Sequence, residues 1–114
     1  MLRDEACLLD ILVAARKARA FCESLTKERF LQDDLAQNAV MRLLTIMGEA
    51  ARKVSEEFKA AHPEIEWRRF VVLRNRLVHE YFRIDLDEVW VVVEDDLAPL
   101  MEQISPLVPP EDAV

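Results

Sequence analysis

The stretch DDLAQNAVMRLLTIMGEAARKVSEEF, residues 33–58, is the longest part of the chain with a helical pattern. Its apolar residues recur at helical spacing, at Leu35, Ala39, Leu43, Met47, Ala50, Val54 and Phe58. This spacing places them on one face of an α-helix. Asp33 or Asp34 can cap the start of the helix, because a short carboxylate accepts hydrogen bonds from the first free backbone N–H groups. We therefore predict one long amphipathic helix that buries this stripe.

The only glycine of the chain, Gly48, lies inside this helix. Glycine costs about 1 kcal/mol relative to alanine at such a position. Close approach by another backbone would compensate for that cost, and simple tolerance of the glycine is the alternative. The helix should end before Pro63, which lacks an N–H and disfavours helical geometry at His62. We expect His62 in a solvent-facing loop.

Helical patterns flank this segment on both sides. Residues 4–24 carry an apolar stripe made of Leu8, Ile11, Leu12, Ala15, Ala18 and Cys22. The charged residues of this segment lie off the stripe, which predicts an amphipathic helix. Thr26 can cap a short helical turn through Phe30. A third main helix is expected from Trp67 to the region of residues 79–82.

A fourth main helix should follow Asp85. Asp85 with Glu88 resembles a capping box, with aspartate in place of serine. The apolar residues of this helix are Val89, Val92, Val93, Leu97, Leu100, Met101 and Ile104. The run VWVVV, residues 89–93, could form a strand in isolation, but no second convincing strand is available to pair with it, so we predict helix. Pro99 should kink or interrupt this helix.

The composition agrees with an all-α domain. A length of 114 residues is typical of one domain, and 52% hydrophobic residues exclude disorder. A single glycine leaves little of the turn chemistry that a sheet of hairpins requires. We predict an up-and-down bundle of four to five helices over residues 1–104, followed by a proline-rich acidic tail over residues 105–114.

Two features point to the cytoplasm. No uncharged stretch exceeds the eight residues 103–110, and the first residues carry charges instead of an apolar signal segment. Cys7 and Cys22 would lie about 22 Å apart in one helix, too far for a disulfide. We expect both to be reduced packing residues.

Positive charge is concentrated in one predicted helix. The chain carries a net charge of −7, which disfavours a polyanionic partner. Residues 67–83, however, carry a net charge of +4, and the remainder carries −11. The basic residues of this helix are Arg68, Arg69, Arg74, Arg76 and Arg83. Arginine can grip phosphate oxygens two at a time, although salt bridges to acidic neighbours should engage two or three of the five.

The polar stretch RNRLVHEYF, residues 74–82, contains one of the two histidines and the only tyrosine. At about 100° per residue, Arg74 and Tyr81 point nearly the same way, whereas His79 lies about 140° from Arg74. These three side chains cannot converge on one straight helix. Either the helix unwinds near His79, or a second copy of the chain supplies the missing partner across a two-fold axis. We favour a symmetric homodimer, which would also join two basic helices in one cleft.

Arg74, His79 and Tyr81 spell Arg-x4-His-x-Tyr, which resembles the motif of HepT toxins within the HEPN superfamily. The segments MGEAARKVS (47–55) and YFRIDLDEVW (81–90), and Trp67 at the start of the motif helix, resemble the HepT layout as well. The likeness spans roughly residues 4–104. It implies a HEPN-type helical-bundle homodimer that is a metal-independent ribonuclease, the toxin of a HEPN/MNT toxin–antitoxin pair. The partner would be a minimal nucleotidyltransferase (MNT) that silences the toxin by transferring AMP to Tyr81.

The chemistry of these residues suits RNA cleavage. RNA carries its own nucleophile, the 2′-hydroxyl, so a site needs a base, an acid and cationic donors for the phosphorane charge. His79 suits the acid or base role, Arg74 suits charge stabilisation, and Asn75 could orient the phosphate or the imidazole. The hydroxyl of Tyr81 could accept a nucleotide, which would block the cleft. The remaining arginines, Arg68, Arg69, Arg76 and Arg83, are the candidate RNA-binding residues.

Each candidate also has a purely structural interpretation. His79 could cap a helix end, and Tyr81 with Phe82 could belong to the core. No metal or other cofactor is expected, because His62 and His79 share no ligand spacing and no cysteine pair supports them. The alternative function is a non-catalytic HEPN module that binds nucleotide, RNA or a partner protein.

Overall fold

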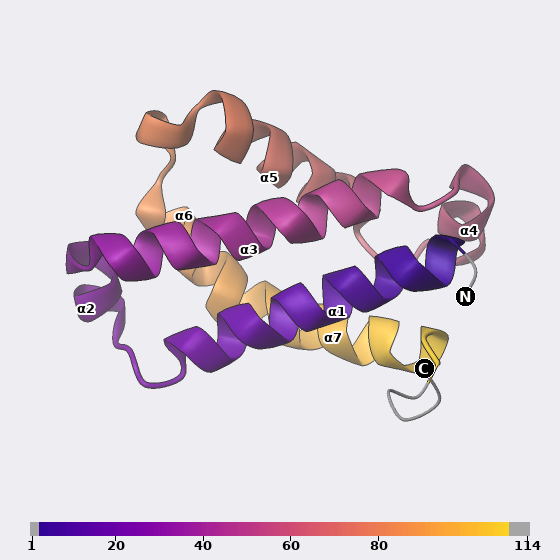
Figure 1. Cartoon of the computed structure of the whole chain (residues 1–114), viewed down its shortest axis with the longest axis horizontal. Coiled ribbons are helices and arrows are strands. Elements are labelled where there is room, and N and C mark those ends of the chain that lie inside the picture. The colour runs from indigo at the N-terminus through magenta and orange to yellow at the C-terminus, as the bar shows by residue number, and fades with distance from the viewer. Residues whose placement is uncertain (1–2, 110–114) are drawn as a thin grey trace.

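The long predicted helix lies at the centre of an all-α bundle in the computed structural model, which describes residues 3–109 (Figure 1). The helices are α1 (Arg3–Cys22), α2 (Lys27–Gln32), α3 (Asp34–Lys53), α4 (Glu56–Ala61), α5 (Trp67–His79), α6 (Leu86–Val91) and α7 (Leu97–Ile104). A π-helical segment, Val92–Asp96, joins α6 to α7, and 3-10 turns lie at Tyr81–Arg83 and Ser105–Leu107. The predicted all-α class is confirmed.

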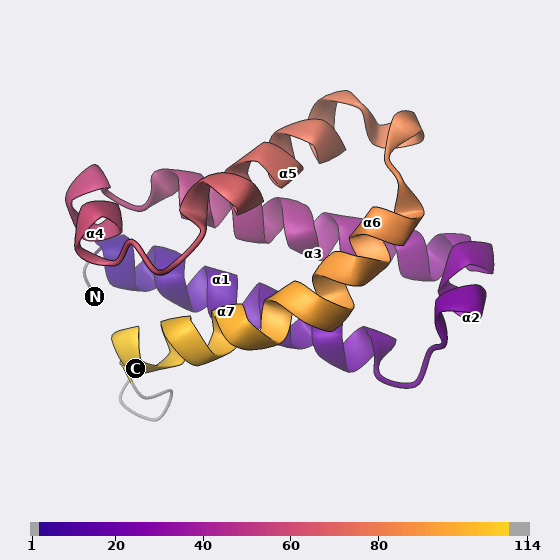
Figure 2. The same cartoon turned by 180° about the vertical axis from the view of Figure 1, so that it is seen from behind.

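Helix α3 is packed between α1 on one side and α5 on the other (Figure 1). Seen from the opposite side, α6, the π-helical segment and α7 form one continuous helical element that crosses the bundle (Figure 2). The Asp33 carboxylate caps α3 by accepting from the Ala36 N–H at 3.0 Å. One of the two predicted caps is therefore confirmed.

The predicted core stripe of α3 was wrong in its first half. Leu35 is 81% exposed, and Ala39 and Leu43 are only partly buried. The buried residues of α3 are Ala36, Gln37, Val40, Met41, Leu44, Met47, Gly48, Ala50 and Ala51. Because α3 has neighbours on two sides, it buries a wider face than a single stripe, and the sequence spacing alone did not identify that face.

Helix α3 also ends earlier than predicted, at Lys53. Val54 adopts an extended conformation, and Ser55 starts the separate helix α4 as its N-cap, with its Oγ accepting from the Phe58 N–H. The Asp4 carboxylate of α1 accepts from the Ser55 N–H at 2.8 Å and from its hydroxyl at 2.7 Å. The prediction of one continuous helix was wrong because these local and long-range hydrogen bonds compete with helix continuation.

Helix α4 ends at Ala61, just before the residues where Pro63 was expected to stop it. His62 lies in the loop after α4, as expected, and its side chain is partly exposed. Its partly buried ring lies against Phe58, with centroids 4.4 Å apart, and its carbonyl accepts from the Trp67 indole N–H at 3.0 Å. His62 therefore helps to fix the loop that leads into α5.

Gly48 lies where α3 and α5 touch. A Cβ at this position would lie 2.6 Å from the Phe70 carbonyl oxygen and 2.3 Å from the Arg74 Cβ. Both distances are too short for real atoms, so the expected close approach of another backbone is confirmed. The contact brings Arg74, the first residue of the motif, onto the surface of α3.

Helix α6 begins as predicted but without the full capping box. The Asp85 carboxylate accepts from the Asp87 N–H at 2.9 Å. Glu88 does not complete the box, because its carboxylate pairs with Arg76 of α5 at 2.7 Å. The tertiary contact with α5 thus replaces the local one.

The helix through VWVVV is confirmed, and so is its interruption. The π-helical segment ends at Asp96, three residues before Pro99, which lies inside α7 and lacks the N–H that would bond to the Asp95 carbonyl. Arg19 of α1 donates to the carbonyls of Val93 and Glu94 at 3.2 Å and 3.0 Å. These hydrogen bonds supply donors to carbonyl groups of the π-helical segment, where the regular α-helical hydrogen bonds are interrupted.

The chain continues beyond Ile104 into the 3-10 turn Ser105–Leu107, and Leu107 and Val108 pack against the core. The domain boundary at residue 104 stays a prediction, and residues 110–114 of the expected tail lie outside the described residues.

Cys7 and Cys22 are both free and buried, as predicted. Burial raises the pKa of the Cys22 thiol to about 11. None of the helices in the described part of the chain has the length and apolar character needed to cross a membrane.

Replacing Gly48 with alanine tests the α3–α5 contact. Alanine gains about 1 kcal/mol of helix propensity, but an added Cβ meets a backbone carbonyl that cannot rotate away, and overpacking costs about 1–3 kcal/mol. We expect Gly48→Ala to lower the free energy of unfolding by up to about 2 kcal/mol in urea titrations. The exposed control Leu35→Ala should change it by less than about 0.5 kcal/mol. A Gly48→Ala variant more stable than the parent would contradict the contact.

The bond between Asp4 and Ser55 predicts a pH dependence. Hydrogen bonds from Ser55, above all from its side chain, lower the pKa of Asp4 below its usual value of 3.8. A carboxylate with a lowered pKa stabilises the folded state above pH 3.8, and this stability is lost as the pH falls through the lowered pKa. Ser55→Ala should therefore cost about 1 kcal/mol at pH 7 and less at a pH below the lowered pKa of Asp4. The exposed Ser24→Ala variant is the control, and an equal loss at both pH values would argue against this coupling.

Candidate active site

The motif residues lie on the last two turns of α5 and on the 3-10 turn that follows. Helix α5 ends at His79, and Glu80 leaves helical geometry with φ −127° and ψ 35°. Tyr81 therefore no longer follows the helical register of Arg74. Of the two alternatives left open by the sequence, unwinding near His79 is present in the chain, and the homodimer stays a prediction.

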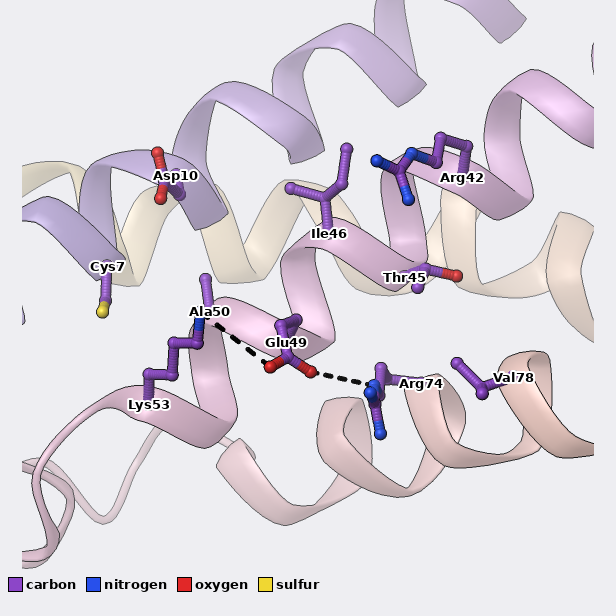
Figure 3. A pocket seen from close by; sticks show the side chains of 10 residues that line it. All are labelled: Cys7, Asp10, Arg42, Thr45, Ile46, Glu49, Ala50, Lys53, Arg74 and Val78. Atoms are coloured by element: carbon purple, nitrogen blue, oxygen red, sulfur yellow. Dashed lines mark ion pairs between the residues drawn. The ribbon is translucent and has the colours of Figure 1, made fainter.

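Arg74 is held at two points of its guanidinium group. Its Nε faces the Glu49 Oε2 atom of α3 at 3.0 Å (Figure 3). Its Nη1 donates to the Asn75 Oδ1 atom at 2.9 Å. About a quarter of the Arg74 side chain stays exposed. The structure thus brings Arg74 and Asn75 together, with Glu49 as a third member of the group.

This group borders a pocket of about 450 Å³ between α1, α3 and α5 (Figure 3). The pocket, called here the Arg74 pocket, is lined by Cys7, Asp10, Arg42, Thr45, Ile46, Glu49, Ala50, Lys53, Arg74 and Val78. Three of these residues are cationic and two are acidic, so the lining carries a net charge of +1. An anionic group in this pocket would meet Arg74 directly.

His79 does not contact Arg74. Its side chain is exposed and, within residues 3–109, it makes no hydrogen bond or ion pair. The imidazole is therefore accessible to a substrate or to another chain. The same described residues contain no group of three or more histidine, cysteine or acidic side chains that could hold a metal ion.

Tyr81 lies at the edge of the bundle and reaches back to α3. Its hydroxyl donates to the Asn38 Oδ1 atom. Its ring packs edge-on against the Phe82 ring, with the ring centroids 5.2 Å apart. Tyr81 is 39% exposed and Phe82 is 97% exposed. The structural interpretation of this pair as core residues is therefore wrong.

Three of the five arginines of the motif region are in ion pairs, as expected. The pairs are Arg69 with Glu66 and Asp96, Arg74 with Glu49, and Arg76 with Glu80 and Glu88. Arg68 and Arg83 are exposed and make no ion pair within the described part of the chain. The assignment of Arg68, Arg69, Arg76 and Arg83 to RNA binding stays a prediction, with Arg68 and Arg83 the two that keep an uncompensated charge.

A model of a known protein family matches most of the chain. The family model described as "Ribonuclease HepT-like" matches residues 11–107, which include the whole motif, Gly48 and Glu49. The chain belongs to the ribonuclease HepT-like family. The resemblance noted in the sequence is thereby confirmed.

Named relatives of this HepT-like chain agree. It is 37% identical over 100 residues to a protein of Thermococcus cleftensis named "Probable ribonuclease HepT", covering 88% of this chain and 91% of the relative. It is 33% identical over 101 residues to "Putative RNase MJ1380" of Methanocaldococcus jannaschii, covering 89% and 93%. No solved structure matches the chain. The comparisons support ribonuclease activity for the family as a whole.

Sequence analysis of this HepT-like chain missed two residues of the site, Asn38 and Glu49. Both lie on α3 and contact motif residues, Asn38 through Tyr81 and Glu49 through Arg74. A signal was present, because the two are eleven residues apart and therefore share one face of a helix. Polar residues on a face that also carries the glycine contact could have identified the α3 side of the site.

Proposed function

We propose that this HepT-like chain is a cytoplasmic toxin of a HEPN/MNT toxin–antitoxin system and that it cleaves RNA as a metal-independent endoribonuclease. The observation that carries the proposal is the guanidinium group of Arg74, held by Asn75 and Glu49 at the wall of a pocket. An exposed His79 stands at the end of the same helix. Family membership and the names of the relatives support ribonuclease activity.

The proposed reaction uses the 2′-hydroxyl of RNA as its nucleophile. His79 takes the proton of this hydroxyl, and the oxygen attacks the adjacent phosphorus atom. Arg74 stabilises the charge of the phosphorane through its terminal nitrogens, while Asn75 keeps the guanidinium group oriented. A protonated imidazole then gives its proton to the departing 5′-oxygen. The products are a 2′,3′-cyclic phosphate end and a 5′-hydroxyl end.

The proposed active form is a symmetric homodimer. A single chain leaves His79 without contact to Arg74, so a second chain would bring a further imidazole to the same phosphate. Apolar side chains beside the motif support such an interface, since Val72 and Val78 are each 45% exposed and Phe82 is 97% exposed. Two His79 side chains could then divide the acid and base tasks.

The proposed partner is a minimal nucleotidyltransferase that uses ATP to modify Tyr81. The Tyr81 oxygen would attack the α-phosphorus of ATP, forming a phosphodiester to AMP, releasing pyrophosphate and losing the hydroxyl proton. The partly exposed hydroxyl, which has only Asn38 as a partner among the described residues, supports this assignment. The added phosphate would oppose the positive charge of Arg74 and Arg83 and fill space beside the motif.

A second candidate function is a non-catalytic HEPN module that binds RNA, nucleotide or a partner. The lack of contact between His79 and Arg74 in a single chain favours it, because cleavage needs both groups at one phosphate. Cleavage assays separate the two functions, since a module would bind RNA and leave it intact.

The ribonuclease proposal predicts cleavage in excess chelator. We expect purified protein to cut labelled cellular RNA into fragments with 2′,3′-cyclic phosphate ends. Arg74→Ala and His79→Ala should each lower the rate about 100-fold or more, because each removes a group that acts in the transition state. Arg29→Ala removes the same charge from an exposed position of α2 and should leave the rate unchanged. Intact RNA after incubation with the parent protein, together with measurable RNA binding, would favour the module.

The antitoxin proposal predicts a modified tyrosine. After co-expression with an MNT protein and ATP, mass spectrometry should find AMP on the peptide that contains Tyr81. Tyr81→Phe lacks the nucleophilic oxygen, so it should stay unmodified and keep its ribonuclease activity in the presence of the MNT protein. A silenced complex with an unmodified Tyr81 would overturn the modification proposal and leave the ribonuclease proposal standing.

A further inference from the structure

The contact between Glu49 and Arg74 has unusual geometry. Among the side chains of residues 3–109, Glu49 Oε2 and Arg74 Nε are the buried polar atoms that lack a hydrogen-bond partner. The two atoms face each other at 3.0 Å as an ion pair, but the N–H of Arg74 is not aligned with the carboxylate oxygen. Buried polar atoms left in this state are unfavourable, and functional sites are one place where they persist.

Glu49 forms ion pairs with more than one cationic side chain. Its Oε1 atom lies 2.6 Å from Arg52 and 3.9 Å from Lys53, while its Oε2 atom faces Arg74. The hydrogen bond from Arg52, with the charges of Arg52, Arg74 and Lys53, lowers the pKa of Glu49. One ionised carboxylate thus holds three cations together, and their combined charge stays positive.

The two contacts of Arg74 leave part of its guanidinium group unused. A guanidinium group has five N–H donors. The Nε donor faces Glu49, and one Nη1 donor bonds to Asn75. The other donors on the terminal nitrogens have no protein partner within the described residues. These are the donors that a phosphate can engage with two oxygens at once.

The position of Glu49 is fixed by its neighbour. Gly48 is the point where α3 touches α5, with Phe70 and Arg74 against its backbone. This contact places the next residue, Glu49, within ion-pair distance of the guanidinium group. Arg42 and Asp10 complete the charges of the Arg74 pocket, and neither pairs with Arg74.

We propose that Glu49 is the positioning residue of this site, holding Arg74 by its Nε edge so that the terminal nitrogens face the phosphate of the RNA. The inference rests on the proposed ribonuclease function. Glu49 touches no reacting atom. Its effect passes through the orientation of Arg74, and a misplaced guanidinium group would stabilise the phosphorane poorly.

Kinetics test this role through a double-mutant cycle. Glu49→Ala should lower kcat about 10- to 100-fold with a smaller change in KM, because orientation matters most in the transition state. In the Arg74→Ala background the same substitution should have little further effect. Glu49→Gln, which keeps the shape and an acceptor oxygen, should lose less. Glu57→Ala, an exposed glutamate of α4, is the matched control. Equal losses in both backgrounds, or an unchanged kcat in Glu49→Ala, would overturn the proposal.

NMR provides a test that does not need activity. The Arg74 Nε–H is shielded from solvent, so its signal should exchange slowly in the parent protein; Arg74→Lys identifies it. Exchange should become at least about tenfold faster in Glu49→Ala and stay unchanged in Glu57→Ala. Unchanged exchange in Glu49→Ala would show that Glu49 does not hold Arg74. If the parent protein cuts no RNA, the proposed function fails, whereas this measurement still decides whether Glu49 fixes the guanidinium group.

Discussion

The site depends on one backbone contact, the approach of α5 to α3 at Gly48. Because position 48 has no side chain, the Phe70 carbonyl and the Arg74 Cβ lie directly against α3. The short distance between α3 and α5 at this point determines which of their side chains can contact each other. Glu49, one residue further along α3, then lies within ion-pair distance of Arg74. A larger residue at position 48 would separate the helices and move the guanidinium group away from its carboxylate.

Charge on α5 is controlled by acidic residues from several elements. Glu49 comes from α3, Glu88 from α6 and Asp96 from the π-helical segment, and each pairs with a different arginine of α5. These pairs attach α5 to the acidic remainder of the chain, and they also neutralise part of its charge. Exposed ion pairs stabilise only weakly, so in the proposed RNA complex a phosphate would compete with the acidic partners of Arg69 and Arg76. Arg68 and Arg83 make no ion pair within the described residues, so a phosphate would not have to displace an acidic partner from them.

Features encoded by neighbouring residues could be predicted from the sequence. The Asp33 and Asp85 caps, the helix through VWVVV, and the close approach at Gly48 all follow from local patterns and were confirmed. Family-specific spacing identified Arg74, His79 and Tyr81 together.

Features that depend on distant residues could not be predicted in the same way. The break between α3 and α4 needs Asp4, which is fifty-one residues from Ser55. The wide buried face of α3 follows from having helices on two of its sides. Glu49 gained a role only when the fold placed α5 beside it. Each of these features depends on a contact between elements that are far apart in the sequence.

The end of α5 places the residues of the two proposed functions, Arg74 and Tyr81, against a single face of α3. Since α5 stops at His79, Tyr81 turns back and donates to Asn38, while Arg74 pairs with Glu49. Asn38 and Glu49 are eleven residues apart on α3, which corresponds to about 16 Å along the axis and a rotation of only about 20°. A nucleotide on Tyr81 would have to replace the bond to Asn38, and its phosphate would then lie along the same face that holds Arg74. In the proposed regulation, modification of the tyrosine would therefore act through the bulk and charge of a nucleotide on this face, without any change in the fold of the bundle.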